Sequence, residues 1–221
     1  MKTVAVVPIK LNNERLPNKN IKAFDNGNPL CYYIFQTLLS ISEIDAVYVY
    51  CSNPDIKKYI PEGVEFLQRC TSLDRNETKM NEVLSAFAQD VKADVYVMTH
   101  ATSPFVGSES IKKGLGKVVS QEYDSAFAVK KIQTFLWENN CPLNYDLNNI
   151  PRTQDLNPIY EETSGFYVYT KNVIDRNRRI GDKPFLVEVN QIESIDIDEQ
   201  QDFDIANAVF NRLINKKQCT V

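Results

Sequence analysis

Short runs of apolar, often β-branched residues alternate along this chain with longer segments in which apolar residues recur at helical spacing. Runs of this length that are rich in β-branched residues are typical of buried strands. The runs occupy residues 4–9, 46–51, 95–99, 125–129, 165–169 and 186–189. We predict a strand at each of them.

Two of the longer segments carry a clear amphipathic pattern. One apolar face consists of Leu30, Ile34, Leu38 and Ile41, and another consists of Phe203, Ala206, Phe210 and Leu213. Each face predicts a helix that packs on an apolar surface. Alternating strands and helices predict an α/β fold, with a mostly parallel sheet and helices on both faces. In such sheets ligands bind beyond the carboxyl ends of the strands, so chemistry is expected in the loops that follow them.

One segment, residues 131–162, departs from this alternation. It contains Trp137, two Asn-Asn pairs, three prolines and little periodicity. A stretch of this length without regular structure is usually functional. We predict an excursion from the sheet that covers the active site, pairs with a second subunit, or does both.

The composition is that of an ordinary globular protein. The 221 residues show no internal repeat, and 43% are hydrophobic and 24% charged. A chain of this length can bury a full core, so we predict a single domain over residues 1–221. The net charge of −4, with the two signs interspersed, provides no positive field for a polynucleotide backbone. A nucleic-acid partner is therefore not expected.

The opening apolar run is too short to span a membrane, and no small-residue cleavage site accompanies it. We expect a cytoplasmic protein with no membrane partner. The five cysteines are scattered and never form a CxxC pair, which supports neither a disulfide framework nor a zinc site. We expect reduced thiols, with Cys51 packed at a strand end and Cys219 in a frayed C-terminus.

The loop after the first predicted strand is rich in positive charge. Four cations, Lys10, Arg15, Lys19 and Lys22, lie within thirteen residues. A loop that holds a triphosphate needs cations and exposed backbone N–H groups. Three asparagines of this loop, Asn12, Asn13 and Asn18, suit that role because asparagine tolerates left-handed backbone angles. The alternative is a solvated basic surface loop.

Two common nucleotide-binding motifs are absent from the sequence. Neither GxGxxG nor GxxxxGK[ST] occurs, and the chain has only seven glycines. A dinucleotide-dependent oxidoreductase and a P-loop NTPase are therefore disfavoured.

Residues 8–20 resemble the signature of the CMP-sialic acid (acylneuraminate) cytidylyltransferases and the equivalent loop of the related 3-deoxy-octulosonate cytidylyltransferases. Lys10 takes the place of the family arginine, Lys19-Asn20 match the family pair, and Arg15 follows the octulosonate version. The resemblance implies that these residues hold the triphosphate and cytosine, with Lys10, Arg15 and Lys19 in the catalytic role. The sequence departs from the family at residues 11–13 and at Glu14, where sialic acid enzymes keep lysine.

Two further segments resemble nucleotide-binding elements of the same family. Residues 100–105 resemble its Gln-Pro-Thr-Ser-Pro-Leu loop, with His100 at the glutamine position beside the substrates. His100 is interpreted as a substrate-binding donor, with a structural histidine and a general base as the alternatives. Ser103 is assigned to the nucleotide, although Ser103-Pro104 also suits a turn before a helix beginning near Ser108. Arg69 ends a segment, 65–69, that resembles the family's nucleotide-binding strand. Its alternative is a surface charge.

Residues 152–169 carry the most specific resemblance, to the family's Arg-x-Gln-Asp-Leu-Pro-Pro-x-Tyr segment and the Asn-Gly-Ala-Ile-Tyr that follows it. The implied substrate-binding residues are Arg152, Gln154, Gly165, Phe166 and Tyr167. A planar guanidinium can bind a carboxylate with two hydrogen bonds, which suits an acid sugar. A loop or interface arginine is the alternative. Ser164 replaces the usual asparagine, which leaves the sugar open.

Two carboxylates, Asp196 and Asp198, alternate along a predicted strand near the end of the chain. They would face one side while Ile195 and Ile197 enter the core. Hard oxygen ligands this close together suit Mg²⁺ with retained waters and phosphate oxygens. Asp198 also fits the N-cap of the final helix, in a capping box with Gln201. The family resemblance favours the metal site.

The family resemblance implies a Rossmann-like nucleotidyltransferase fold and a homodimer, with residues 131–162 contributing to the pairing. The predicted reaction is Mg²⁺-dependent transfer of CMP from CTP to a hydroxyl of an acidic, sialic-acid-like sugar, with release of pyrophosphate. The alternatives are a different acceptor, such as an octulosonate or a polyol phosphate, and a non-catalytic nucleotide-binding homologue. The hypothesis requires Lys19 and Asp196 to lie at the same end of the molecule.

Overall fold

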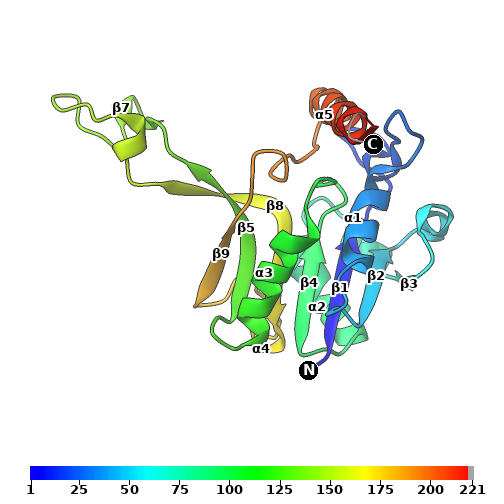
Figure 1. Ribbon diagram of the computed structural model, residues 1–221. Helices are drawn as coiled ribbons and strands as arrows, with labels where there is room; N and C mark the ends of the chain where they lie inside the picture. The colour runs from blue at the N-terminus through cyan, green and yellow to red at the C-terminus, as the bar shows by residue number, and fades with distance from the viewer. Residues whose placement is uncertain (219–221) are drawn as a thin grey trace.

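The computed structural model describes residues 1–218, in which seven strands form one twisted sheet covered by helices on both faces (Figure 1). The sheet strands are β1 (Thr3–Pro8), β2 (Ala46–Cys51), β3 (Val64–Gln68), β4 (Val95–Thr99), β5 (Ser125–Ile132), β8 (Ile159–Thr170) and β9 (Pro184–Glu188). Their order is β3-β2-β1-β4-β8-β5-β9. All neighbours pair in parallel except those of β8, which runs antiparallel between β4 and β5. The predicted mostly parallel α/β sheet is confirmed.

The α-helices are α1 (Leu30–Leu39), α2 (Met80–Asp90), α3 (Ser108–Val119), α4 (Lys171–Ile174) and α5 (Gln200–Gln218). Short 3₁₀ helices occur at η1 (Lys19–Ile21), η2 (Pro54–Tyr59), η3 (Thr71–Asp74) and η4 (Thr153–Asp155). Apolar residues of α1 and α3 pack on one face of the sheet, and those of α2 and α4 pack on the other. Strand β1 serves both layers, because its successive side chains alternate between the two faces.

Helix α5 packs at the carboxyl end of the parallel strands, opposite the N-terminus (Figure 1). Phe203, Ala206 and Phe210 form the buried face that the sequence predicted, and they contact Phe24 from the loop before α1. The Phe24 ring is 2% exposed, with its centroid 4.8 Å from that of Phe210. This third cluster joins the last helix to the first loop.

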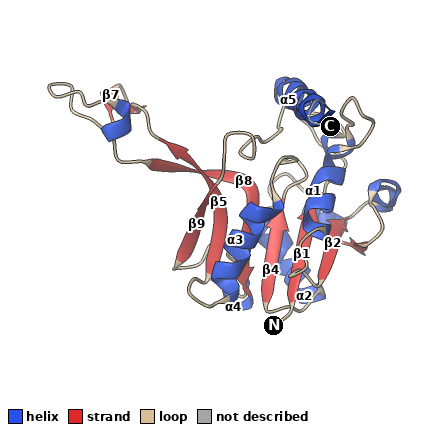
Figure 2. Cartoon of the chain, in the orientation of Figure 1, coloured by secondary structure: helices blue, strands red, loops and turns tan. Residues whose placement is uncertain are grey.

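The segment 131–162 has more regular structure than its sequence indicated. Strands β5 and β8 run out of the sheet together, with pairs from Val129–Glu162 to Ile132–Ile159. Beyond them lie η4 and a small hairpin of β6 (Trp137–Glu138) and β7 (Cys141–Pro142). The predicted strand at 165–169 is therefore only the inner part of β8. Figure 2 shows this arm extending well beyond the body of the molecule.

The structure also bears on the predictions for the cysteines and for membrane-spanning helices. Cys51 is fully buried at the end of β2, as predicted, whereas Cys219 lies outside the described residues. No helix in the described part of the chain combines the length and apolarity needed to cross a bilayer.

The Phe24→Ala substitution is expected to lower the free energy of unfolding by about 3–5 kcal/mol, because it leaves a cavity among packed aromatic rings. Urea unfolding followed by circular dichroism measures the change. Ile205→Ala is the matched control, since the Ile205 side chain on α5 is 53% exposed. This substitution should lower the free energy of unfolding by less than about 1 kcal/mol. Equal effects of the two substitutions would contradict the assigned packing.

Candidate active site

The first loop folds around a left-handed asparagine. Asn18 adopts φ 57° and ψ 23° and is followed by η1. Buried Asn20 donates its side-chain amide to the Lys10 carbonyl oxygen at 2.8 Å, which closes the loop on itself. The expectation of left-handed angles at Asn12 and Asn13 was wrong, because neither residue has a positive φ. A side chain, rather than exposed amides, organises that part of the loop.

Cations of this loop meet a carboxylate from the other end of the chain. Lys19 Nζ lies 2.8 Å from Asp198 Oδ1, and Arg15 Nη1 lies 2.7 Å from Asp198 Oδ2. Lys19 also donates to the Ile197 carbonyl oxygen at 3.2 Å. Burial opposes ionisation of Asp198, but the hydrogen bond from Lys19 and the two positive charges outweigh it and lower its pKa. The cluster therefore stays charged near neutral pH.

A cleft of about 310 Å³ opens beside this cluster. It lies beyond the carboxyl ends of β1 and β4, where this class of sheet binds ligands. Residues from four separate parts of the sequence line it: Pro8, Lys10, Asn13, Arg15, Lys19, Asn20, His100, Ala101, Thr102, Ser164, Asp196 and Asp198. The structure thus brings together the predicted catalytic residues, the predicted metal ligands, Asn20 and His100. Lys19 and Asp196 lie at the same end of the molecule.

The two aspartates sit on an extended segment that is not a strand. Residues 195–198 pair with no strand, so the predicted strand was wrong. Ile197 donates its backbone N–H to the Thr102 carbonyl oxygen at 2.9 Å and is fully buried. Ile197 therefore enters the core while Asp196 and Asp198 line the cleft, which is the same alternation that a strand produces.

The alternative role of Asp198, as the N-cap of a capping box with Gln201, is not adopted. The carboxylate of Asp202 accepts from the backbone N–H groups of Asp198 and Glu199, at 3.0 and 2.9 Å. Asp202 therefore satisfies the start of α5 from within the helix. The side chain of Asp198 is left for the cations of the first loop.

The donor set of the cleft fits a divalent cation. Asp196 Oδ1 is buried and has no hydrogen-bond partner among the described residues. A buried carboxylate oxygen without a partner is costly, and a cation is one means of satisfying it. Mg²⁺ commonly binds through one or two carboxylates together with water and substrate phosphates. Asp196 and Asp198 are suitable for that mode.

His100 follows β4 and borders the cleft from its partly buried position. Burial lowers the pKa of His100 to about 4, against the raising effect of the Asp196 charge. A neutral imidazole has one N–H donor and one acceptor nitrogen. His100 can therefore make the kind of hydrogen bond that an amide side chain makes.

Ser103 and Arg69, the remaining predicted nucleotide ligands, are buried and do not line the cleft. Ser103 is 1% exposed and its backbone N–H donates to the His100 carbonyl oxygen, so it forms the predicted turn. Arg69 is 6% exposed and binds Asp74 through Nε and Nη2, at 3.1 and 2.8 Å. The alternative of a surface charge at Arg69 was wrong. Its guanidinium holds the loop after β3 against Tyr50, whose carbonyl oxygen accepts at 3.4 Å.

A network that the sequence did not indicate connects this loop to the first one. Lys10 Nζ donates to Asn76 Oδ1 at 3.0 Å, and Asn76 Nδ2 donates to Glu14 Oε1 at 2.7 Å. Glu14 thus restrains Asn76, which in turn orients Lys10. A lone polar residue such as Asn76 carries no sequence signal of its own, because its proximity to Lys10 and Glu14 arises only on folding.

The predicted acceptor-binding residues are divided between the arm and the core. Arg152 lies on the arm, where its Nε and Nη2 bind Asp155 at 2.7 and 3.1 Å, and Gln154 is exposed nearby. Neither lines the cleft of its own chain. In β8, Phe166 and Tyr167 are buried in the two sheet layers, and a Cβ on Gly165 would lie 3.0 Å from Val106 Cγ2. Gly165 therefore allows close packing of β8.

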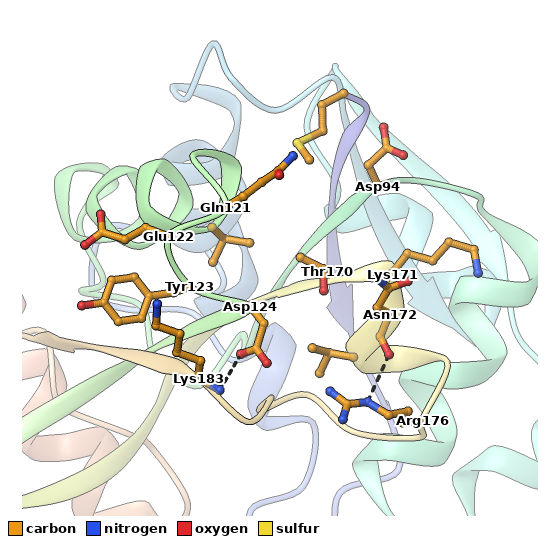
Figure 3. A pocket seen from close by; sticks show the side chains of 13 residues that line it. Asp94, Gln121, Glu122, Tyr123, Asp124, Thr170, Lys171, Asn172, Arg176 and Lys183 are labelled. Atoms are coloured by element: carbon orange, nitrogen blue, oxygen red, sulfur yellow. Dashed lines mark hydrogen bonds between the residues drawn. The ribbon is translucent and has the colours of Figure 1, made fainter.

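A larger hollow of about 640 Å³ lies at the amino ends of the parallel strands (Figure 3). Its charges are mostly paired within the protein. Asp124 accepts from the backbone N–H groups of Asp182 and Lys183, while Lys171 pairs with Asp175 and Arg176 with Asp182. The larger hollow lies at the wrong end of the sheet for ligand binding, and its charges are already paired. The smaller cleft is therefore the better candidate for the active site.

The model of the cytidylyltransferase family matches residues 4–217 of this chain. The N-acylneuraminate cytidylyltransferase of Oncorhynchus mykiss is 27% identical in an alignment of 212 positions that covers 91% of this chain and 49% of that protein. The pseudaminic acid cytidylyltransferase of Campylobacter jejuni is 24% identical in an alignment of 228 positions that covers 95% of this chain and 97% of that protein. The chain spans about half the length of the N-acylneuraminate cytidylyltransferases that it matches.

Solved structures share the architecture. The structure of CMP:2-keto-3-deoxy-manno-octonic acid synthetase complexed with CTP has a TM-score of 0.73 at 14% identity, covering 96% of this chain and 99% of that one. A similarity at this level of identity establishes the fold alone. The predicted Rossmann-like nucleotidyltransferase fold is thereby confirmed.

We expect the imidazole of His100 to remain neutral down to roughly pH 5, well below its ordinary pKa of about 6.5. Nitrogen-15 NMR of the imidazole measures this directly, and the signal needs no assignment because His100 is the sole histidine. The urea-unfolded chain serves as the control and should titrate near pH 6.5. A similar midpoint in the folded protein would contradict the burial described.

Proposed function

The chain belongs to the cytidylyltransferase family, and from that premise we propose that it transfers CMP from CTP to a hydroxyl group of an acidic sugar, releasing pyrophosphate. One observation carries the proposal. Lys19 and Arg15 converge with Asp198 on a cleft at the carboxyl end of the sheet, beside Lys10 and Asp196. Both the relatives and the CTP-bound structural neighbour support this assignment by their names.

The three cations account for binding and charge neutralisation. Lys10, Arg15 and Lys19 line one cleft and face two carboxylates, so an excess of positive charge remains for a triphosphate. Preorganised cations stabilise the charge that develops on the phosphates and on the leaving pyrophosphate. Asn20 would bind the nucleotide at the cleft wall, while Ser103 and Arg69 would act from behind it, by holding the two loops in place.

Asp196 and Asp198 would hold Mg²⁺ in this reaction. The bound cation would polarise the α-phosphate and lower the pKa of the attacking hydroxyl. The buried, unpartnered Oδ1 of Asp196 and the low pKa of Asp198 both favour this role.

The acceptor side of the site combines His100 with β8. The neutral imidazole of His100 would donate a hydrogen bond to the sugar, and Gly165, Phe166 and Tyr167 would shape the wall behind it. Arg152 and Gln154 lie at η4 on the arm and do not line their own cleft. We propose that they serve the acceptor site of a second copy, which the arm would reach in a homodimer.

The test is pyrophosphate release across a panel of nucleotides and acceptors. We expect turnover with CTP and Mg²⁺ on at least one of N-acetylneuraminate, pseudaminate and 3-deoxy-manno-octulosonate, and none with ATP, GTP or a polyol phosphate. Asp196→Asn should lower kcat/KM by at least about 100-fold, since a metal site contributes several kcal/mol.

Asp204→Asn is the matched control, because this carboxylate is exposed on α5 and, within residues 1–218, accepts a hydrogen bond from Gln200 alone. It should leave turnover unchanged. Turnover of a polyol phosphate would reassign the acceptor, and full activity in Asp196→Asn with its fold intact would refute the metal site.

The arm makes a separate prediction about assembly. Trp137 and Ile150 are 55% and 60% exposed, an unusual position for large apolar side chains on one projecting segment. We expect a dimer in sedimentation velocity, and the double variant Trp137→Ser/Ile150→Ser should sediment as a monomer with turnover reduced at least about tenfold. Leu39→Ser, at a 36% exposed site on the body, is the control and should remain dimeric. A wild-type monomer with full activity would exclude an arm-mediated site.

A further inference from the structure

Arg179 places a guanidinium against β8 from a segment that the sequence did not mark. It belongs to residues 175–183, between α4 and β9. Its guanidinium carbon lies 4.5 Å from the ring centroid of Tyr167 in β8. The side chain is only 29% exposed. A cation on an aromatic face, removed in large part from water, is held in a defined position.

The hydrogen-bonding capacity of Arg179 is poorly used within the protein. Its Nη2 makes a long contact of 3.3 Å with Glu162 Oε1, and its Nε is buried with no acceptor among the described residues. Glu162 Oε1 also accepts from the Tyr167 hydroxyl at 2.5 Å, so this oxygen is shared. A buried guanidinium normally has acceptors for its donors.

The neighbouring arginines show what a satisfied side chain in this segment looks like. Arg176 and Arg178 reach the two carboxylate oxygens of Asp182 at 2.5 and 2.6 Å. Both are more exposed than Arg179, with 46% and 43% of the side chain accessible. Of these three arginines, the most buried one therefore has the weakest partner.

The register of β8 relates Arg179 to the end of β4. Tyr167 pairs with Met98 and Phe166 with Thr99, which places this part of β8 beside the end of β4, just before His100. Ser164, three residues before Tyr167 in the same strand, lines the cleft together with His100. Arg179, which stacks on the Tyr167 ring, therefore lies beside the part of β8 that leads into the cleft.

We propose that Arg179 binds the carboxylate of the acid sugar and so determines the preference for an acidic acceptor. The inference rests on the proposed function. A carboxylate is planar and accepts two hydrogen bonds from one guanidinium. Within the described part of the chain, the guanidinium of Arg179 has N–H donors free for such a pair of bonds. The long contact with the partly exposed Glu162 is readily exchanged for the ligand, and the Tyr167 ring supports the guanidinium meanwhile. Arg152, in contrast, already binds Asp155 through Nε and Nη2.

The experiment compares acid and neutral acceptors in wild type, Arg179→Gln and Arg179→Lys. The probes are N-acetylneuraminate, pseudaminate and 3-deoxy-manno-octulosonate, each with its C1 carboxamide, which keeps the shape and removes the charge. In Arg179→Gln we expect kcat/KM for the best acid to fall about 10- to 100-fold, mainly through KM. Activity on the carboxamide and the KM for CTP should change less than about twofold. Arg179→Lys should recover part of the loss, because a lysine keeps the charge without the fork.

Arg178→Gln is the matched control, since it removes the same charge one residue away and should leave the acid-to-amide ratio unchanged. Calorimetric binding of the same acids and amides is measured alongside turnover. If wild type transfers CMP but Arg179→Gln keeps the wild-type ratio, the inference is overturned and the proposed function stands. If wild type binds an acid through Arg179 without CMP transfer, the proposed function fails and the inference stands. Absence of both binding and transfer overturns both.

Discussion

The ion cluster of Arg15, Lys19 and Asp198 is the interaction on which the candidate site depends. It joins the loop after β1 to the segment before α5, more than 170 residues later in the chain, as the separation of Lys19 and Asp198 shows. Exposed ion pairs contribute little stability on their own, and Asp198 is partly exposed. The value of the cluster lies in position, since it holds cations and carboxylates around one cleft with positive charge in excess.

Apolar packing supplies the stability that this cluster lacks. Phe24, at the end of the first loop, is buried against Phe203 and Phe210 of α5, and Ile197 is inserted into the same cluster. The Ile197 N–H bond to Thr102 adds the loop after β4 to the assembly. Three loops are thus tied together behind the cleft, so the charged residues in front of it need no mutual attraction to stay in place.

Strand β8 links the cleft to the arm. Its antiparallel insertion between β4 and β5 brings Ser164 to the cleft and Tyr167 to the level of the β4 end. The same strand continues into the arm, where Arg152 and the exposed Trp137 lie. One element therefore connects the nucleotide cleft, the proposed carboxylate contact at Arg179 and the proposed dimer contact, and a change in its register would disturb all three.

The sequence by itself determined the alternation of strands and helices, the basic first loop and the aspartate pair, because each depends on residues that are near one another in the chain.

The sequence misplaced the features that depend on distant partners. The segment 195–198 resembles a strand but has no strand beside it, and Asp202 replaces Asp198 at the start of α5 because two cations from the first loop bind Asp198 instead. The alternative of a surface charge at Arg69 failed because Asp74 and Tyr50 enclose its guanidinium. Arg179 is one of several arginines in an aperiodic stretch. It is distinguished from the others only by its contacts with Glu162 and Tyr167 of β8. Tertiary structure decided these cases, because burial and charge pairing are set by neighbours in space and local periodicity carries no information about them.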